Sequence, residues 1–271
     1  GRHGDITRDD VLRAASGSGP ATGAPAAMPA FTPTIVGTPK ERIPVRGVLR
    51  SMAQAMVQSA YTAPHVTCWL EVDVTASTAL ISKLRTDAAY EGSRVTLLTL
   101  ASVGLIRATS EHPRLNSCWV ESTDGAEIVV HGNVGLGIAV AGGKGLVVPV
   151  VAEAEALSTP QLANALTGLV ERARAGTTAP AEMLGCTVTI TNIGALGMDG
   201  GTPILVPGTA GILAMGRVVR KPWVVKDGDT EKVEVRDIAT LAMSFDHRIM
   251  DGEAGSKALK SVADFLAAPS L

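Results

Sequence analysis

The sequence contains few aromatic residues and few cysteines. The first shortage limits what the core can be built from, and the second argues against disulfide-linked and zinc-binding proteins. Trp, Tyr and Phe together make up 3% of the 271 residues, while the hydrophobic share is 46%. We therefore expect a core built from Val, Leu, Ile, Ala and Met. The three cysteines, Cys68, Cys118 and Cys186, lie far apart and lack the spacing of zinc ligands. A disulfide framework and a zinc site are therefore not expected, and a reducing compartment fits this pattern.

The sequence also lacks a large net charge and long apolar runs. Twenty-four Lys and Arg residues face 26 Asp and Glu residues, with no basic run, so nucleic acid is not an expected partner. No apolar run reaches the ~18–20 residues that cross a bilayer, and residues 1–5 lack the apolar core of a secretion signal. We expect a soluble, cytoplasmic protein. No glycine-rich nucleotide-binding motif opens a helix.

The composition changes along the first 40 residues. Residues 1–15 end in the pattern of a short helix that is too small to fold alone. Residues 16–40 contain five prolines among Ala, Gly, Ser and Thr, a composition that predicts an extended linker. We expect a piece of a larger modular protein, although a flexible N-terminus has the same composition. The globular domain is expected over 41–271.

Helical and strand periodicities alternate through residues 41–271. Apolar residues three and four positions apart predict helices near 49–60, from 75, and over 95–111, 158–176 and 253–267. Alternating apolar residues predict strands at 66–74, 117–121, 127–130, 134–141, 145–151, 186–191, 210–216, 218–225, 232–236 and 238–245. Asp-Gly pairs at 124–125 and 227–228 predict hairpin turns. This order indicates an α/β (α+β) domain with a mixed sheet covered by helices.

The most informative segment for chemistry is residues 246–252, Asp-His-Arg-Ile-Met-Asp-Gly, between the last strand and the last helix. His247 is flanked by charged residues on both sides. Its ordinary pKa of ~6.5 suits proton transfer near neutral pH, which makes it the best candidate for a general base. The alternative is a solvated turn in which Asp251 and Gly252 only begin the helix, since Asp is an ordinary cap.

A second segment, residues 187–194, is a β-branched strand that leads into a glycine-containing loop. Thr187, Thr189 and Thr191 share one face, and Thr191 is the last of them before the backbone turns. A hydroxyl group at that place could donate a hydrogen bond to an oxyanion. Threonines on a strand face more often reflect β-propensity alone.

Together these motifs resemble the catalytic domain of dihydrolipoamide acyltransferases, the core subunits of 2-oxo acid dehydrogenase complexes. Besides Asp-His-Arg-x-x-Asp-Gly, the resemblance covers RIPVRG at 42–47, PHVT at 64–67, GLVVPV at 145–150, TITNIG at 189–194 and TPI at 202–204, in the family's order. Residues 4–11, GDITRDDV, are similar to the tail of that family's peripheral subunit-binding domain. The lipoyl-bearing Asp-Lys-Ala sequence is absent from these 271 residues.

The resemblance implies a fold and an activity. It implies a chloramphenicol-acetyltransferase-like two-layer sandwich, assembled as a trimer or a larger cage, with the site between subunits. The implied reaction moves an acyl group from S-acyl-dihydrolipoamide to coenzyme A, without a metal. By matching positions, His247 would be the base, Thr191 the oxyanion donor and Asp251 a supporting group, which could also orient the motif through Arg248.

The resemblance extends to substrates and partners. Arg46 and Arg50 are the candidates for contacts with coenzyme A phosphates, because Leu49 replaces one of two adjacent basic residues found in many family members. The lipoyl group would be carried by a domain outside this sequence, and the implied partners are the decarboxylase and dihydrolipoamide dehydrogenase subunits. The loop 197–201, Gly-Met-Asp-Gly-Gly, looks closest to branched-chain acyltransferases. Acetyl (pyruvate dehydrogenase) and succinyl specificity are the alternatives.

Two other functions compete with this interpretation. A cysteine-nucleophile acyltransferase could pair Cys186 or Cys118 with His65, His112 or His131, but free cysteines in strands more often belong to a core. A non-enzymatic assembly scaffold would only oligomerise and dock partners through the linker. An assay of acyl transfer distinguishes both from the predicted enzyme.

Overall fold

The computed structural model describes residue 8 and residues 33–271 except 143, 144 and 229. The chain divides into two units, Gly1–Pro44 and Val45–Leu271. Residues 33–44 are exposed and contain no helix or strand. Apart from residue 8, the predicted subunit-binding tail over 1–15 lies outside the described residues, as does most of the predicted linker over 16–40. These domain boundaries therefore remain predictions.

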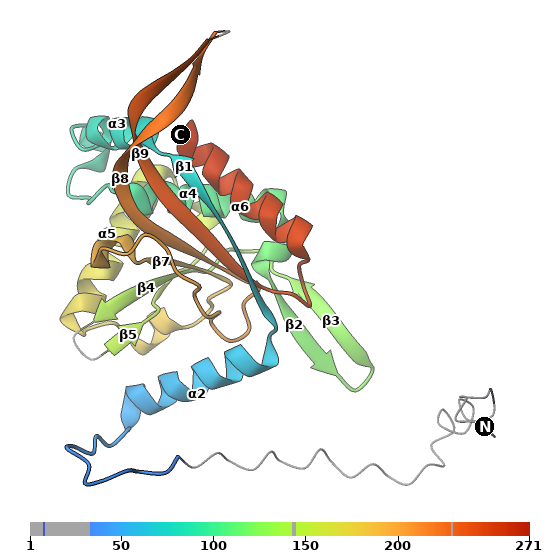
Figure 1. Ribbon diagram of the computed structural model, residues 1–271. Coiled ribbons are helices and arrows are strands. Elements are labelled where there is room, and N and C mark those ends of the chain that lie inside the picture. The colour runs from blue at the N-terminus through green and yellow to red at the C-terminus, as the bar shows by residue number, and fades with distance from the viewer. Residues whose placement is uncertain (1–7, 9–32, 143–144, 229) are drawn as a thin grey trace. The chain divides into compact units, whose positions relative to one another are not determined.

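The second unit contains both helices and strands (Figure 1). Its helices are α2 (Gly47–Thr62), α3 (Thr75–Leu84), α4 (Leu97–Glu111), α5 (Thr159–Ala175) and α6 (Gly252–Ala267). Its strands are β1 (His65–Asp73), β2 (Ser117–Ser122), β3 (Gly125–Val130), β4 (Leu136–Gly142), β5 (Gly145–Val147), β6 (Val150–Val151), β7 (Val188–Asn192), β8 (Gly211–Asp227) and β9 (Thr230–Asp246). In the described part of the chain, no helix is long and apolar enough to cross a membrane.

The described strands form one mixed sheet and one separate hairpin. The sheet has the order β1–β9–β8–β7–β4–β5, with β6 paired to β4, and β2 and β3 pair only with each other. Neighbours β4, β7 and β8 are parallel, whereas β8, β9 and β1 are antiparallel. The predicted mixed α/β sheet with helices is thereby confirmed.

The strand boundaries differ from the sequence prediction in three places. The strands predicted at 232–236 and 238–245 are one strand, β9. The strands predicted at 210–216 and 218–225 are likewise one strand, β8, whose register with β9 shifts between Met215 and Val218 at a bulge. A bulge breaks the alternation of side chains but not the strand. The predicted strand 145–151 is instead two short strands, β5 and β6, separated at Val148 and Pro149. Pro149 cannot donate a backbone hydrogen bond to a neighbouring strand.

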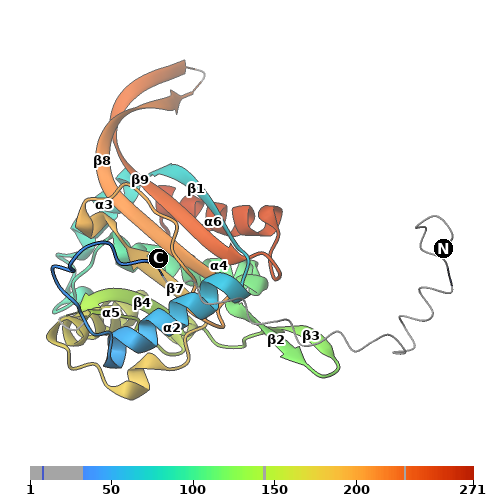
Figure 2. The ribbon, with the colours of Figure 1, turned by 60° about the horizontal axis from the view of Figure 1, so that its bottom comes forward.

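Helices α3 to α6 cover one face of the sheet (Figures 1 and 2). The main core lies between these helices and the sheet, and it includes Leu213, Met243 and Phe245, which are fully buried. Helix α6 approaches β9 closely at Gly255, because a Cβ atom there would lie 2.2 Å from Phe245 Cε1. This close approach holds the beginning of α6 against the end of β9, where the motif at residues 246–252 lies.

The opposite face of the sheet is covered by the segment 193–210, which α2 contacts where the Ser59 hydroxyl group donates a hydrogen bond to the Leu205 oxygen at 2.7 Å. Ala63, Leu205 and Ile212 form a small second core there. The segment packs tightly on β8, since a Cβ atom on Gly216 would lie 1.9 Å from the backbone oxygen of Asp199. It is also tied to the start of β1, because the Leu205 N–H donates a hydrogen bond to His65 Nε2 at 3.0 Å. This face contains the Thr191 side chain described below.

Candidate active site

The motif at residues 246–252 forms a tight turn between β9 and α6. Asp246 is only 2% exposed, and its carboxylate accepts hydrogen bonds from Arg248 Nη2 at 2.6 Å and Arg248 Nε at 3.0 Å. The Arg248 backbone N–H also donates to Asp246 Oδ1, at 3.0 Å. The hydrogen bond to Asp246 raises the pKa of the Arg248 guanidinium against the opposing effect of burial. Both residues that flank His247 are therefore fixed in place.

Trp119 of β2 supports the same turn from the separate hairpin. Arg248 Cζ lies 4.9 Å from the centroid of the Trp119 ring, a distance typical of a cation–π contact. The hairpin thereby contacts the side chain that holds Asp246. Trp119 is not among the predicted site residues, because no local pattern links a tryptophan on one strand to an arginine 129 positions later.

His247 lies at the exposed side of this turn. Its backbone N–H donates a hydrogen bond to the Pro64 oxygen at 2.8 Å, and its ring centroid lies 6.2 Å from that of Phe245. No side chain among the described residues forms a hydrogen bond with the imidazole ring. The backbone is thus held while the ring stays accessible, as a general base requires.

Asp251 begins α6. Its Oδ1 accepts a hydrogen bond from the Ala254 N–H at 2.8 Å, which is the geometry of a helix N-cap. The suggestion that Asp251 orients the motif through Arg248 is wrong, because Arg248 pairs with Asp246 instead. The structure therefore gives Asp251 a capping role next to His247, and a role in the chemistry remains a prediction.

Thr191 lies near the end of β7, on the sheet face that the segment 193–210 covers. The hydroxyl group of Thr187 bonds to Asn116 and Gly135, and that of Thr189 lies 3.4 Å from Cys186 Sγ. The Thr191 hydroxyl has no partner among the described residues. Of Thr187, Thr189 and Thr191, only Thr191 therefore has a hydroxyl group that is available to a substrate.

Thr191 faces an apolar pocket of about 350 Å³. The other lining residues are mostly hydrophobic and come from α2, the strands and the segment 193–210: Met56, Ala139, Leu146, Val148, Thr189, Ile193, Gly201, Thr202, Pro203, Ile204, Val206, Ile212 and Ala214. A hydrogen-bond donor in such surroundings is stronger than in water, because little solvent competes for the acceptor.

His247 and Thr191 do not meet within one chain. Thr191 aligns with Ala214, which aligns with Ala242, so Thr191 lies two strands from β9, about 10 Å away. From Ala242, β9 continues to Asp246 before the turn, a further ~13 Å. A hydrogen bond spans only ~3 Å. A site that uses both side chains therefore requires a second copy of the chain.

Arg46 and Arg50 lie at the beginning of α2 and are exposed. Neither residue lines the pocket that contains Thr191, and neither forms an ion pair with another described residue. The structure therefore does not bring them together with Thr191 or His247, and their predicted contacts with coenzyme A remain a prediction.

The cysteines do not form a nucleophilic site in the described part of the chain, where no cysteine bonds to a histidine. Burial raises the pKa of the Cys68 and Cys186 thiols, which disfavours the reactive thiolate. Both ring nitrogens of His65 are occupied by Ala63 O and the Leu205 N–H. The His112 ring bonds to Ser261. These contacts argue against the cysteine–histidine alternative.

No three His, Cys, Asp or Glu side chains of the described residues gather as a metal site would require. The groups that the described residues do offer are the exposed His247 imidazole, the free Thr191 hydroxyl group and the apolar pocket beside Thr191. This combination suits proton abstraction coupled to stabilisation of an oxyanion.

Comparison with known proteins identifies the family. A model of the 2-oxoacid dehydrogenases acyltransferase (catalytic domain) family matches residues 37–271. The chain is 37% identical over 244 residues to the dihydrolipoyllysine-residue acetyltransferase component of the pyruvate dehydrogenase complex of Bacillus subtilis, covering 90% of this chain and 54% of that protein. It thus spans about half the length of this relative.

Two solved structures share the fold. One is dihydrolipoamide acetyltransferase of Azotobacter vinelandii, studied for the role of a serine, a histidine and an asparagine in its catalytic mechanism, with a TM-score of 0.78 and 28% identity over 88% of this chain and 98% of that chain. The other is the cubic core of a pyruvate dehydrogenase multienzyme complex, with a TM-score of 0.76 and 28% identity over 88% of this chain and 98% of that chain. The resemblance drawn from the sequence motifs is confirmed, and the chain belongs to the family of acyltransferase catalytic domains of 2-oxoacid dehydrogenases.

Proposed function

We propose that residues 41–271 transfer an acetyl group between dihydrolipoamide and coenzyme A. The observation that carries the proposal is the turn at residues 246–251, in which the Asp246–Arg248 pair fixes the backbone around an accessible His247 imidazole. In the Azotobacter vinelandii relative, the histidine and the asparagine under study are four positions apart. His247 and Asp251 have the same spacing.

The reaction needs a base because a thiol with a pKa near 8.5 is mostly protonated at pH 7. The His247 imidazole accepts the proton of the coenzyme A thiol. The thiolate attacks the carbonyl carbon of S-acetyl-dihydrolipoamide, and a C–S bond forms as the carbonyl oxygen becomes negatively charged. The intermediate then expels the dihydrolipoamide sulfur, which takes the proton back from the imidazolium. The products are S-acetyl-coenzyme A and dihydrolipoamide, and the imidazole is neutral again.

Thr191 supplies the oxyanion donor in this proposal. Its hydroxyl group is free and faces an apolar pocket, where a donor contributes most to the stability of a developing charge. Because His247 and Thr191 of one chain are too far apart, the donor comes from a second copy. We infer a trimer or a larger core, and the cubic core of the pyruvate dehydrogenase relative supports this assembly.

The proposed acyl group is acetyl rather than the branched-chain group expected from the loop at 197–201. The Bacillus subtilis and Azotobacter vinelandii relatives are both acetyltransferases. The loop at 197–201 lies over β8 and β9, where Asp199 pairs with Arg217 at 2.7 Å, and only Gly201 of the loop lines the Thr191 pocket. Its sequence is therefore a weak indicator of the size of the acyl group.

The substrates and partners follow from the same proposal. The lipoyl group would be delivered by a domain outside these 271 residues, and the decarboxylase and dihydrolipoamide dehydrogenase would be partners of the whole protein. Arg46 and Arg50 remain proposed contacts to coenzyme A.

The proposal is tested by mixing two variants of strongly reduced activity, His247→Ala and Thr191→Val. If each site combines His247 of one copy with Thr191 of another, about a quarter of the sites in randomly mixed oligomers contain both wild-type residues. Acetyl transfer from acetyl-coenzyme A to dihydrolipoamide should then increase after the two variants are unfolded and refolded together. The control is each variant refolded alone, which should keep its ~10²-fold lower activity.

Activity that does not increase in well-folded mixed oligomers contradicts a site shared between copies. A wild-type chain that oligomerises but transfers no acyl group supports the scaffold alternative instead. A comparison of kcat/KM for acetyl, succinyl and isobutyryl donors then decides the acyl group, and the acetyl donor is expected to give the largest value.

A further inference from the structure

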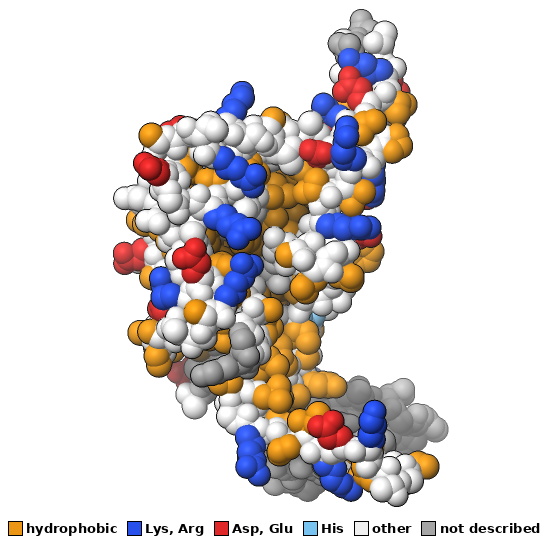
Figure 3. Space-filling model, turned by 90° about the vertical axis from the view of Figure 1, so that its left-hand side faces the viewer, with side chains coloured by type: hydrophobic (Ala, Val, Ile, Leu, Met, Phe, Trp, Pro, Cys, Tyr) orange, Lys and Arg blue, Asp and Glu red, His pale blue; other side chains and the backbone are white. Residues whose placement is uncertain are grey.

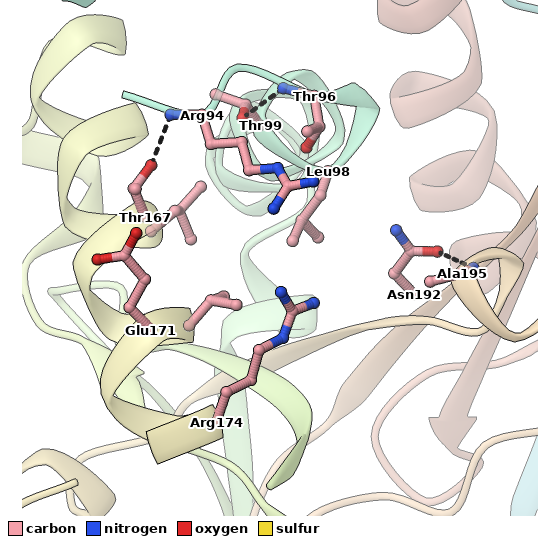
Figure 4. Close-up of a pocket in the computed structure, with 11 residues that line it drawn as sticks. Arg94, Thr96, Leu98, Thr99, Thr167, Glu171, Arg174, Asn192 and Ala195 are labelled. Atoms are coloured by element: carbon pink, nitrogen blue, oxygen red, sulfur yellow. Dashed lines mark hydrogen bonds between the residues drawn. The ribbon is translucent and has the colours of Figure 1, made fainter. Parts of the chain in front are cut away.

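A second cavity lies on the helix-covered side of the sheet, between α4, α5 and the end of β7 (Figure 4). It is separate from the Thr191 pocket, and none of the residues discussed above as a catalytic group lines it. Its floor is apolar, with Leu98, Leu166 and Val170 among its lining residues. On the side of the molecule that carries α3 and α5, Lys and Arg side chains border a hollow with a hydrophobic floor (Figure 3).

Two arginines direct their charges into this cavity. The guanidinium groups of Arg94 and Arg174 both point into the space between the two helices (Figure 4). Neither forms an ion pair with a described carboxylate. Glu171 also lines the cavity, but its carboxylate points toward Thr167 and away from the two guanidinium groups (Figure 4). Two cations that share an apolar cavity repel each other, and an anion between them removes this cost.

Asn192 adds a neutral donor on the opposite wall. Its Oδ1 accepts a hydrogen bond from the Ala195 N–H at 3.2 Å, which leaves its amide NH₂ group turned toward the cavity (Figure 4). The first turn of α4 also lines the cavity, through Thr96, Leu98 and Thr99. The positive end of this helix therefore adds to the same electrostatic preference.

The size of the cavity limits what it can hold. Its volume of about 230 Å³ is below the ~300–1,000 Å³ of pockets that enclose whole small molecules. It suits one compact charged group of a larger ligand. We propose that this cavity binds a phosphate group, with Arg94 and Arg174 as its two cationic ligands and Asn192 as a neutral donor.

The position of the cavity suggests where the phosphate comes from. Asn192 lines this cavity and the preceding residue, Thr191, lines the pocket on the other face of the sheet. A phosphate held by Arg94 and Arg174 can therefore belong to coenzyme A whose thiol end passes the end of β7 toward Thr191, and this source rests on the proposed acyl transfer. A separate phosphorylated ligand has the same chemistry.

Isothermal titration calorimetry with adenosine 3′,5′-bisphosphate measures Kd for the cavity and does not depend on enzymatic activity. Arg94→Gln and Arg174→Gln should each raise Kd about tenfold, the effect of one charge-assisted hydrogen bond at an accessible site. Glu171→Gln should lower Kd, because it removes the negative charge beside the ligand. Arg220→Gln, on β8 and not among the residues that line the cavity, removes one exposed positive charge and should leave Kd unchanged.

Two further results identify the molecule that carries the phosphate group, and a third would show that the cavity does not bind phosphate through these arginines. A tenfold rise in the KM for coenzyme A with unchanged kcat in Arg94→Gln and Arg174→Gln assigns the phosphate to coenzyme A. An unchanged KM together with weaker binding of inorganic pyrophosphate assigns the cavity to a separate phosphorylated ligand. Bisphosphate and pyrophosphate binding that is equal in all variants, or absent in the folded wild-type chain, overturns the proposal even if acyl transfer is confirmed.

Discussion

The Arg248 guanidinium joins the buried Asp246 carboxylate to the Trp119 ring. It donates to Asp246 Oδ2 at 2.6 Å and lies 4.9 Å from the ring centroid of Trp119. Three residues from two parts of the chain therefore support the backbone on which His247 is placed, while the imidazole itself stays free of intramolecular hydrogen bonds to described side chains. The most direct predictions concern this arrangement.

Removal of the Arg248 side chain should destabilise the protein. In Arg248→Ala the Asp246 carboxylate, which is 2% exposed, loses its cationic partner. The loss of one partner of a buried pair costs about 3–5 kcal/mol, and the lower end applies because part of Arg248 is solvent-exposed. Denaturant unfolding measures the change. Asp246→Asn combined with Arg248→Met removes both charges and should recover part of the loss, whereas an unchanged midpoint for Arg248→Ala shows that the pair contributes little.

His247→Ala should lower kcat for acetyl transfer by at least ~10²-fold, the smaller end of general-base contributions. The fold should be intact, because the imidazole contacts no described side chain through a hydrogen bond and only its backbone is tied to Pro64. Steady-state kinetics and thermal unfolding measure the two effects. A well-folded variant with wild-type turnover removes His247 from the mechanism.

Thr191→Val should lower kcat by ~10²-fold with little change in KM, because an oxyanion donor acts mainly in the transition state. Thr191→Ser is the matched control, since it keeps the hydroxyl group and should retain most of the activity. If the valine variant changes only KM, Thr191 contributes to substrate binding instead.

Two variants of Asp251 distinguish a role as helix N-cap from a role in catalysis. Asp251→Ala removes the N-cap of α6 and should lower the free energy of unfolding by about 1 kcal/mol. Asp251→Asn keeps a capping oxygen, so both stability and kcat should stay near the wild-type values. A large loss of kcat in the asparagine variant without a loss of stability would instead place the charge of Asp251 in the chemistry.

Cys186 should be dispensable for catalysis. Burial raises the pKa of its thiol, so in the folded protein the thiolate forms only at a higher pH than in the unfolded chain. Cys186→Ser should keep wild-type acetyl transfer. In a Cys68→Ser, Cys118→Ser background, reaction of Cys186 with a thiol reagent should begin at a higher pH in the folded protein than in denaturant. An inactive but folded serine variant revives the cysteine-nucleophile alternative.

Local signals predicted most of the elements. Ser158 and Gly176 bound α5 as predicted: Ser158 is the N-cap, with its N–H and hydroxyl group donating to Gln161 Oε1, and Gly176 has a positive φ of 70°. The helix expected from residue 75 does begin at Thr75, but its N-cap is Val74, and the Thr75 N–H and hydroxyl group both donate to Asp73 Oδ1. A hydroxyl residue at a helix start can be capped by its neighbour as easily as it can cap, so residue type alone does not decide the boundary.

The local pattern of the 271 residues was enough for the class of fold, the family and the position of His247, because period, turn chemistry and short motifs are properties of neighbouring residues. Contacts between segments that lie far apart in the sequence could not be predicted from such local patterns. The pairing of Arg248 with Trp119, the free hydroxyl group of Thr191 and the convergence of Arg94 and Arg174 depend on strand register and helix packing. These are set by how the whole core closes, since a shift of one residue in β2 or β7 would turn Trp119 or Thr191 to the opposite face, and the positions of the arginines depend on how α5 and the turn at residues 246–252 pack.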